Sequence, residues 1–159
     1  MKSLKLVIAA TLLTGAGAAT AQSGAGGGPK GTVLTFVRGK CSSLILAGTD
    51  MTAECSPALV NAAYPTGGSS FMFTISGKAM VSFFGRDNPA VGGHAMIYLQ
   101  RVSFRDSTPN DPSSEVSGIC TYGNPFKGHA VIDCEADSND GRFKAVFTTD
   151  GQQPQVTRL

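Results

Sequence analysis

The stretch VSGICTYGNPFKGHAVIDC, residues 116–134, decides the fold, because it sets two cysteines on either side of a turn signal. Thirteen residues separate Cys120 from Cys134, and their midpoint is Lys127, inside the turn-forming run 124–128. A chain that reverses there places the two cysteines opposite each other on neighbouring strands. Opposed strand residues lie about 4.5–5.5 Å apart at Cα, which suits a disulfide. The stretch therefore predicts a β-hairpin closed by a Cys120–Cys134 disulfide.

The same spacing occurs a second time, between Cys41 and Cys55, around a turn signal at residues 47–50. Both pairs share a Val-x-Gly-x-Cys frame at an offset of 79 residues, which indicates either internal duplication, or chance or convergence. Four cysteines allow three pairings, and the two turns favour Cys41–Cys55 with Cys120–Cys134. Each bridge closes a loop of about fifteen residues, worth roughly 3 kcal/mol in the chain-entropy model. A zinc or redox site would need close CxxC pairs, and the sequence has none.

Strand signals recur along the chain at intervals of about 8–12 residues, which favours a sandwich or barrel. Alternating runs such as Phe71-x-Phe73-x-Ile75 have the period of a half-buried strand. We expect an all-β fold: a single antiparallel β-sandwich or small barrel of about nine short strands, with two hairpin disulfides and a core dominated by phenylalanine. The strands are expected at residues 32–37, 44–46, 51–55, 59–64, 71–75, 79–84, 95–104, 115–122, 129–134 and 142–148, with loops at 85–93 and 106–114 and a frayed tail after Gly151.

An export signal opens the chain. Lys2 and Lys5 precede a short apolar run, and small residues end at Ala21, so residues 1–21 are predicted to be a signal peptide cut after Ala21. The apolar run is shorter than the ~20 residues that span a bilayer. Residues 22–31 are expected to form a Gly-rich flexible linker and residues 32–159 a single β-domain. No later segment is apolar enough to span a membrane, and we expect a periplasmic or secreted product.

The charge balance argues against nucleic acid as a partner. Without residues 1–21, eleven basic residues match eleven acidic ones, so the remaining chain is formally neutral. Basic residues predominate in 30–105 and acidic ones in 106–140. This asymmetry indicates solvated turns or a dipole that orients a partner.

Several short strings carry a resemblance. They are GICTYGNPFKG at 118–128, CEA at 134–136, GRF at 141–143, TDG at 149–151, AYPTG at 63–67 and FMF at 71–73. Together they resemble small exported bacterial proteins of uncharacterised type, over most of residues 39–153. The resemblance implies export and a single β-domain and transfers no catalytic residue.

Catalytic signals are weak. The histidines are His94 and His129, and no Gly-x-Ser-x-Gly elbow, HExxH motif or phosphate loop is present. Glu54, Glu115 and Glu135 would be available to a glycosidase, but the sequence does not show whether any two of them pair. No cofactor is expected.

Three functions remain open. The leading hypothesis is an exported non-enzymatic β-module that binds a protein or is structural in the cell envelope, with contact loops at 47–50, 86–93 and 124–128 and Phe126 as the possible partner contact. An inhibitor is one form of it. The second is a small periplasmic hydrolase using carboxylates or His94. The third is a binder of a small apolar ligand, whose mark would be an internal cavity of several hundred cubic ångströms.

Overall fold

The computed structural model describes residues 28–76, 79–91, 94–106 and 111–159, and these contain ten β-strands and two 3-10 helices. The predicted signal peptide, residues 1–21, and residues 22–27 of the predicted linker lie outside them. In chain order the elements are β1 (Val33–Leu46), β2 (Thr49–Asp50), η1 (Thr52–Glu54), β3 (Cys55–Ala63), β4 (Ser69–Ile75), β5 (Ala79–Val91), β6 (His94–Arg105), β7 (Ser113–Tyr122), η2 (Pro125–Lys127), β8 (Val131–Ser138), β9 (Gly141–Thr149) and β10 (Gln155–Arg158).

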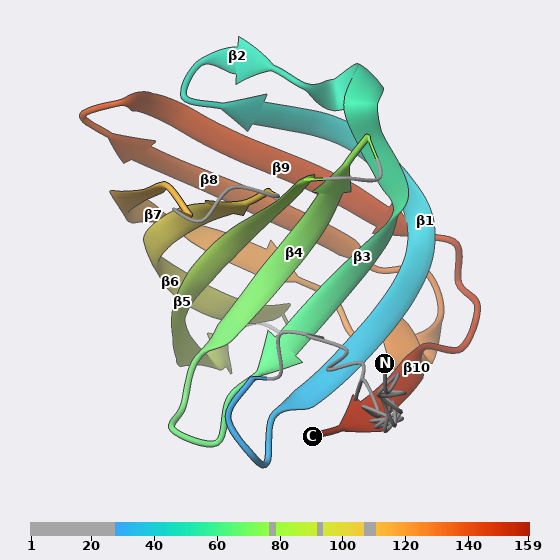
Figure 1. Ribbon diagram of the computed structural model, residues 1–159. Coiled ribbons are helices and arrows are strands. Elements are labelled where there is room, and N and C mark those ends of the chain that lie inside the picture. The colour runs from blue at the N-terminus through green and yellow to red at the C-terminus, as the bar shows by residue number, and fades with distance from the viewer. Residues whose placement is uncertain (1–27, 77–78, 92–93, 107–110) are drawn as a thin grey trace, which may run out of the picture.

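Eight of these strands close into an antiparallel barrel (Figure 1). From β3 to β9 each strand pairs with the next along the chain, and β1 closes the ring by pairing with both β3 and β9. Closure gives each of these strands a strand neighbour on both sides over much of its length, which is how up-and-down barrels resolve the edge problem. The expected all-β fold with two disulfides is confirmed in its barrel form.

The first strand, β1, spans a region in which the sequence predicted two separate strands. Its first half, residues 33–38, pairs with β3, and its second half, from Gly39 to Ile45, pairs with β9 on the opposite edge. The register with β9 shifts between Cys41 and Ser43, which marks a β-bulge. Bulges bend a strand and increase its twist, so the two predicted strands at 32–37 and 44–46 join into one bent strand.

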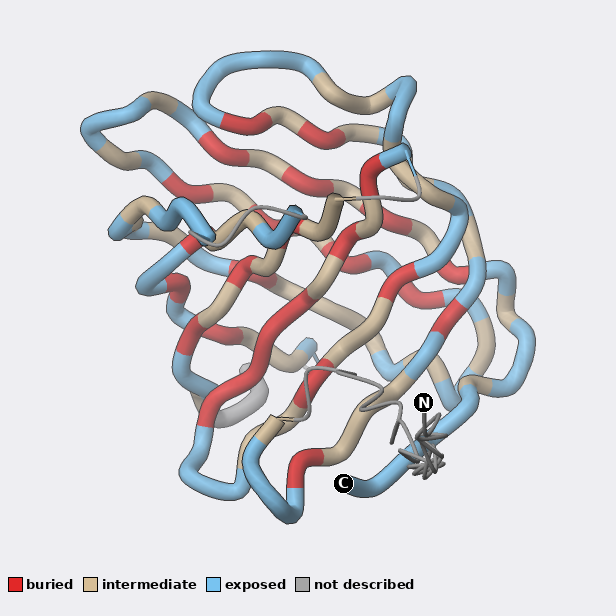
Figure 2. The backbone as a smooth tube through the Cα atoms, in the orientation of Figure 1, coloured by how far each residue is buried: buried red, intermediate tan, exposed pale blue. Residues whose placement is uncertain are grey.

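The barrel interior is filled by alternate residues of each strand. Buried positions alternate with half-buried or exposed ones along the strands (Figure 2). Phe73 lies at the centre of an aromatic cluster, with its ring centroid 5.6 Å from that of Phe83 and 6.4 Å from that of Phe147. On β9, Phe143 is fully buried whereas Arg142 is exposed, as the alternation predicted. The middle of the barrel is therefore a packed core.

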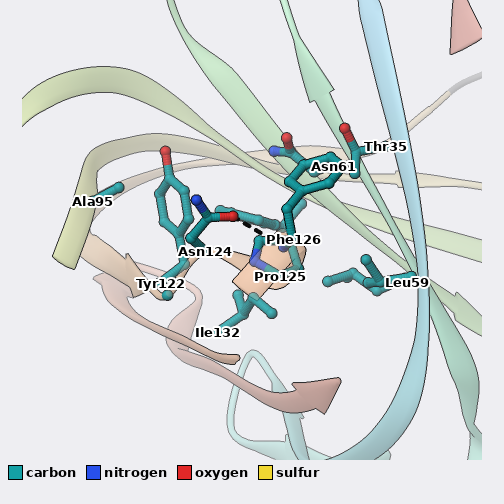
Figure 3. Close-up of a pocket in the computed structure, with 12 residues that line it drawn as sticks. Thr35, Leu59, Asn61, Ala95, Tyr122, Asn124, Pro125, Phe126 and Ile132 are labelled. Atoms are coloured by element: carbon teal, nitrogen blue, oxygen red, sulfur yellow. Dashed lines mark hydrogen bonds between the residues drawn. The ribbon is translucent and has the colours of Figure 1, made fainter. Parts of the chain in front are cut away.

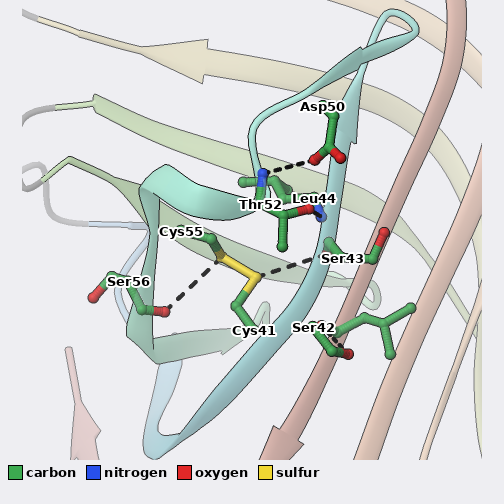
Figure 4. Close-up of a disulfide and its surroundings, with 9 residues drawn as sticks. Cys41, Ser42, Ser43, Leu44, Asp50, Thr52, Cys55 and Ser56 are labelled. Atoms are coloured by element: carbon green, nitrogen blue, oxygen red, sulfur yellow. Dashed lines mark hydrogen bonds between the residues drawn. A yellow bond between two sulfur atoms is a disulfide. The ribbon is translucent and has the colours of Figure 1, made fainter.

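The two disulfides join the predicted cysteines. Cys120 and Cys134 are register partners on β7 and β8, and both are completely buried. Cys41 and Cys55 are half-buried, with Cα atoms 6.1 Å apart, where β1 and β3 diverge (Figure 4). One bridge therefore lies in the core and the other at its margin.

Close to the Cys41–Cys55 bridge, η1 and the residue before it provide hydrogen-bond partners for backbone groups at the edge of β1. Thr52 Oγ1 accepts a hydrogen bond from the backbone N–H of Leu44 (Figure 4). The N–H of Met51 donates to the Leu44 carbonyl. Side-chain and loop partners of this kind replace the missing strand neighbour. The segment before β3 therefore bonds to β1 where β3 itself does not pair with it.

Three sequence predictions are wrong. The strand expected at residues 51–55 is instead the 3-10 turn η1, and only Cys55 belongs to a strand, because the Thr52 N–H donates to the Asp50 carboxylate and this local hydrogen bond favours a turn. Residues 86–91 are not part of a loop but continue β5, which pairs with β6 as far as Val91; Gly92 and Gly93 lie outside the described residues. The bulge at Gly85, where the register shifts, lets the strand continue past the glycine. The tail after Gly151 does not fray, because β10 pairs with the start of β1 and the backbone N–H of Leu159 donates to Thr32 O.

Candidate functional site

A cavity of about 390 Å³ opens at the end of the barrel that carries η2, hereafter the η2 end. Its walls come from six strands, β1, β3, β4, β6, β7 and β8, together with η2 (Figure 3). The wall is mainly apolar, with Val37, Leu59, Phe71 and Ile132 at its inner side. An eight-stranded barrel has room either to fill its interior with side chains or to hold one small ligand. This barrel does both, because it is packed in the middle and hollow at the η2 end.

The cavity exists because small or polar residues replace aromatic ones at the interior positions. Toward the η2 end, β1 turns Thr35 inward, β3 turns Asn61 inward and β6 turns Ala95 inward. In the middle of the barrel the corresponding space is occupied by Phe73 and other fully buried phenylalanines. The volume lost at three positions is not replaced by any other side chain of the described residues, which leaves the space open.

One side of the cavity is formed by the short segment between β7 and β8. Asn124 caps η2, because its Oδ1 accepts a hydrogen bond of 2.9 Å from the backbone N–H of Phe126, and Pro125 starts the helical turn. The Phe126 side chain then projects toward the wall where Thr35 and Asn61 lie (Figure 3). It remains 48% exposed. Phe126 therefore neither packs onto the sheet nor points away from the molecule, but lies at the cavity mouth.

Tyr122 gives the cavity its most distinctive polar group. Its ring packs edge-on against Phe71, with centroids 5.0 Å apart. Burial, and secondarily the negative charge of Asp87, raise the pKa of the Tyr122 phenol above its usual value. Asp87 lies outside the cavity lining, where its carboxylate accepts hydrogen bonds from the Ser69 hydroxyl at 2.8 Å and the Gly68 N–H at 3.3 Å. The phenol therefore stays neutral at physiological pH.

The two histidines lie apart from this cavity. His94 is the first residue of β6 and is exposed. His129 is held by a 2.8 Å hydrogen bond between its Nδ1 and the Thr149 carbonyl, and it lies beside a shallow hollow with Arg38 and Lys40. Neither lines the η2-end cavity.

The glutamates lie on three different elements. Glu54 ends η1, Glu115 is exposed on β7, and Glu135 on β8 is engaged by Lys144 and Arg142 of β9. The hydrogen bond from Lys144 is the main cause that lowers the pKa of Glu135. Within the described part of the chain, no group of three or more His, Cys, Asp or Glu side chains could hold a metal ion.

The predicted contact loops have different structures. Residues 47–50 form an exposed turn and the short strand β2, tied to β9 by a hydrogen bond from Gly48 N to Arg142 O. Residues 86–91 belong to β5, and residues 124–128 form η2 and its caps. Only the last of the three borders a cavity with a mainly apolar wall.

Sequence reasoning identified Phe126 but missed the residues that surround it. Thr35, Asn61 and Tyr122 occupy interior positions of β1, β3 and β7. The available signal was a polar residue that interrupts an apolar strand, as Asn61 does between Val60 and Ala62.

No protein-family model matches the chain, and neither a curated protein nor a solved structure shows significant similarity to it. No helix among the described residues has the length and apolar character required to cross a membrane. The fold, with its two disulfides, is compatible with an exported structural or binding module.

Proposed function

We propose that the protein is an exported, non-enzymatic binding module and that it holds a small, largely apolar molecule in the cavity at the η2 end. The observation that carries the proposal is an apolar-walled space of about 390 Å³ in a barrel whose middle is closely packed. Pockets of this size and lining are typical of small-molecule sites. Export is itself part of the proposal and is supported by the two disulfides, since such bridges persist in oxidising compartments.

The packed part of the barrel favours a preformed site. Six strands fix the positions of the wall residues, and the caps of η2 fix the direction of Phe126. A rigid site reduces the ordering cost of binding. The cavity therefore needs little rearrangement beyond the Phe126 side chain to admit a ligand.

A titration with the neutral fluorophore N-phenyl-1-naphthylamine tests the proposal, using protein produced from the full 159-residue sequence. We expect a saturable, blue-shifted fluorescence increase with one site per chain. The substitution Ala95→Leu should fill part of the cavity and lower the affinity for the fluorophore at least tenfold. Absence of saturable binding, or equal binding by the Ala95→Leu variant, would reject the cavity as the site.

Phe126→Ala and Phe36→Ala form a matched pair for the cavity mouth. Both phenylalanines are partly exposed, by 48% and 38%, but Phe126 borders the cavity and Phe36 lies on the outer face of β1. Phe126→Ala should lower the affinity for the fluorophore several-fold, and Phe36→Ala should leave that affinity unchanged. If both variants bind the fluorophore like the parent while Phe126→Ala alone abolishes capture of an envelope protein, the protein-binding hypothesis replaces ours.

A further inference from the structure

The polar atoms that the cavity wall leaves free are defined by the hydrogen bonds already made. Asn61 Nδ2 donates to the Ser70 carbonyl at 3.1 Å, so the other amide atom, Oδ1, is an acceptor without a protein donor among the described residues. Asn124 Oδ1 accepts from the Phe126 N–H, and its Nδ2 has no acceptor among the residues that the structure describes, which leaves it available as a donor at the mouth. The Tyr122 hydroxyl can donate and accept, and it has no protein hydrogen-bond partner among the described residues.

The wall carries no charge to match an ionic ligand. None of the twelve lining residues is acidic or basic. The charge that acts on the Tyr122 phenol is negative and belongs to Asp87, which lies outside the lining. Moving a carboxylate from water into an apolar space without a cation is costly. Lys127 follows Phe126 on η2 but is exposed and does not line the cavity.

From these contacts, and resting on the proposed function, we infer that the ligand is an uncharged amphipathic molecule. Its polar head carries both an acceptor and a donor, as a primary amide does, and is recognised by Tyr122, Asn61 and Asn124. Its apolar body lies against Leu59 and Phe71. The complementary head satisfies groups that water satisfies in the free protein, and the apolar wall supplies most of the affinity.

A competition series with one chain length and three heads tests this assignment. Octanamide, octanoate and octylammonium each displace N-phenyl-1-naphthylamine at pH 7 from protein produced from the full sequence. Octanamide should act at concentrations at least tenfold below those of the two ions. If octanoate or octylammonium displaces the fluorophore as well as octanamide does, the inference is wrong.

Two substitutions change the head-binding atoms while preserving local structure. Tyr122→Phe keeps the ring that packs on Phe71 and removes the hydroxyl; it should lower the affinity for octanamide relative to that for the fluorophore about three- to tenfold, the value of one hydrogen bond. Asn124→Asp keeps a capping oxygen and replaces the free amide donor with an anionic oxygen, so preference should shift from octanamide toward octylammonium. Tyr98→Phe is the control, because Tyr98 is half-exposed on β6 outside the cavity.

The proposed function and the head-group assignment fail on different results. If the fluorophore does not bind, or binds the Ala95→Leu variant equally well, the proposed function fails. If the fluorophore binds in the cavity but Tyr122→Phe does not lower the affinity for octanamide relative to the fluorophore, and Asn124→Asp does not shift the preference toward octylammonium, the inference alone fails. Thermal unfolding of each variant shows whether a loss of binding reflects a loss of fold.

Discussion

Removing the buried disulfide should cost clearly more stability than removing the half-buried one. The comparison is between the double variants Cys120→Ala/Cys134→Ala and Cys41→Ala/Cys55→Ala. Both bridges span a sequence separation of 14, so each closes a loop of the same length. The chain-entropy contribution, about 3 kcal/mol in each case, therefore cancels when the two variants are compared.

The remaining difference comes from burial. Cys120 and Cys134 are completely buried on neighbouring strands within the core, so loss of their sulfur atoms leaves a void. A single deleted methylene-sized group in a core costs about 0.5–1.5 kcal/mol, which gives about 1–3 kcal/mol for two. Cys41 and Cys55 are half-buried at the core margin, where solvent fills the space. We expect losses of about 4–6 kcal/mol for the buried pair and about 3 kcal/mol for the other.

Guanidinium chloride unfolding under non-reducing conditions measures the difference. The midpoint should fall in the order parent, Cys41→Ala/Cys55→Ala, Cys120→Ala/Cys134→Ala, with similar slopes for the two variants because their loops are equal. Since domains of this size are stable by only 5–15 kcal/mol, the last variant is also measured in sucrose, which favours the folded state. Equal midpoints, or a more stable Cys120→Ala/Cys134→Ala variant, would refute the reasoning from burial.

Three further outcomes follow from packing and charge, each measured by thermal or denaturant unfolding. Gly118→Ala should destabilise the protein by about 2–3 kcal/mol, because the new Cβ would lie 2.0 Å from the Glu135 carbonyl oxygen. Gly123→Ala is the control and should cost under about 1 kcal/mol, because its Cβ would have no contact below 3.4 Å. Equal losses for the two variants would contradict the close approach at Gly118. Phe73→Ala should cost about 3–5 kcal/mol because Phe73 is fully buried among aromatic rings, and a loss below about 2 kcal/mol would contradict the packed core. Folding lowers the pKa of Glu135, so the stability that this carboxylate contributes is present above its unfolded pKa and is lost as the pH falls through its folded pKa. Glu135→Gln should therefore flatten the acid side of the plot of stability against pH. An unchanged acid side would contradict the ion pairs of Glu135.

The class of fold was predictable because the informative signals are local. The alternation of residues 71–75 and 142–148 and the two cysteine spacings depend on near neighbours, and all correspond to structure. Closure of the barrel depends instead on the pairing of β1 with β9, which are about a hundred residues apart. A period-2 pattern does not encode which strand pairs with which, so the sequence left sandwich and barrel equally open.

Two of the wrong predictions, those for residues 86–91 and for the tail after Gly151, share a cause, because both read weak local strand propensity as absence of structure. Gly85 and Asn88-Pro89 are turn formers, yet β5 continues through them because β6 supplies a hydrogen-bonding partner. Residues 155–158 are all exposed and three of the four are polar, yet they form β10 because β1 extends beyond the end of β9 and offers a hydrogen-bonding edge there. In both cases a tertiary neighbour overrides propensity.

The candidate site was less predictable than the fold. Phe126 was found because an aromatic residue within a turn is conspicuous in any sequence. Asn61 and Thr35 become meaningful only once they are known to face the same interior from adjacent strands. The cavity is a property of residues that are small or polar at several interior positions at once, and no single position announces it.

The recurring Val-x-Gly-x-Cys frame has a physical basis that requires no duplication of the chain. A Cβ on Gly39 would lie 2.0 Å from the Thr148 carbonyl oxygen, and one on Gly118 would lie equally close to that of Glu135. In each copy a neighbouring strand crosses too near for any side chain. A small barrel must coil its strands sharply, and glycine at such points allows the close approach. Since side chains alternate along a strand, the cysteine two residues later lies on the same face of the strand as the glycine, where a bridge to the adjoining strand can form. The same geometry therefore selects the same residues on two strands, once within the core and once at its margin.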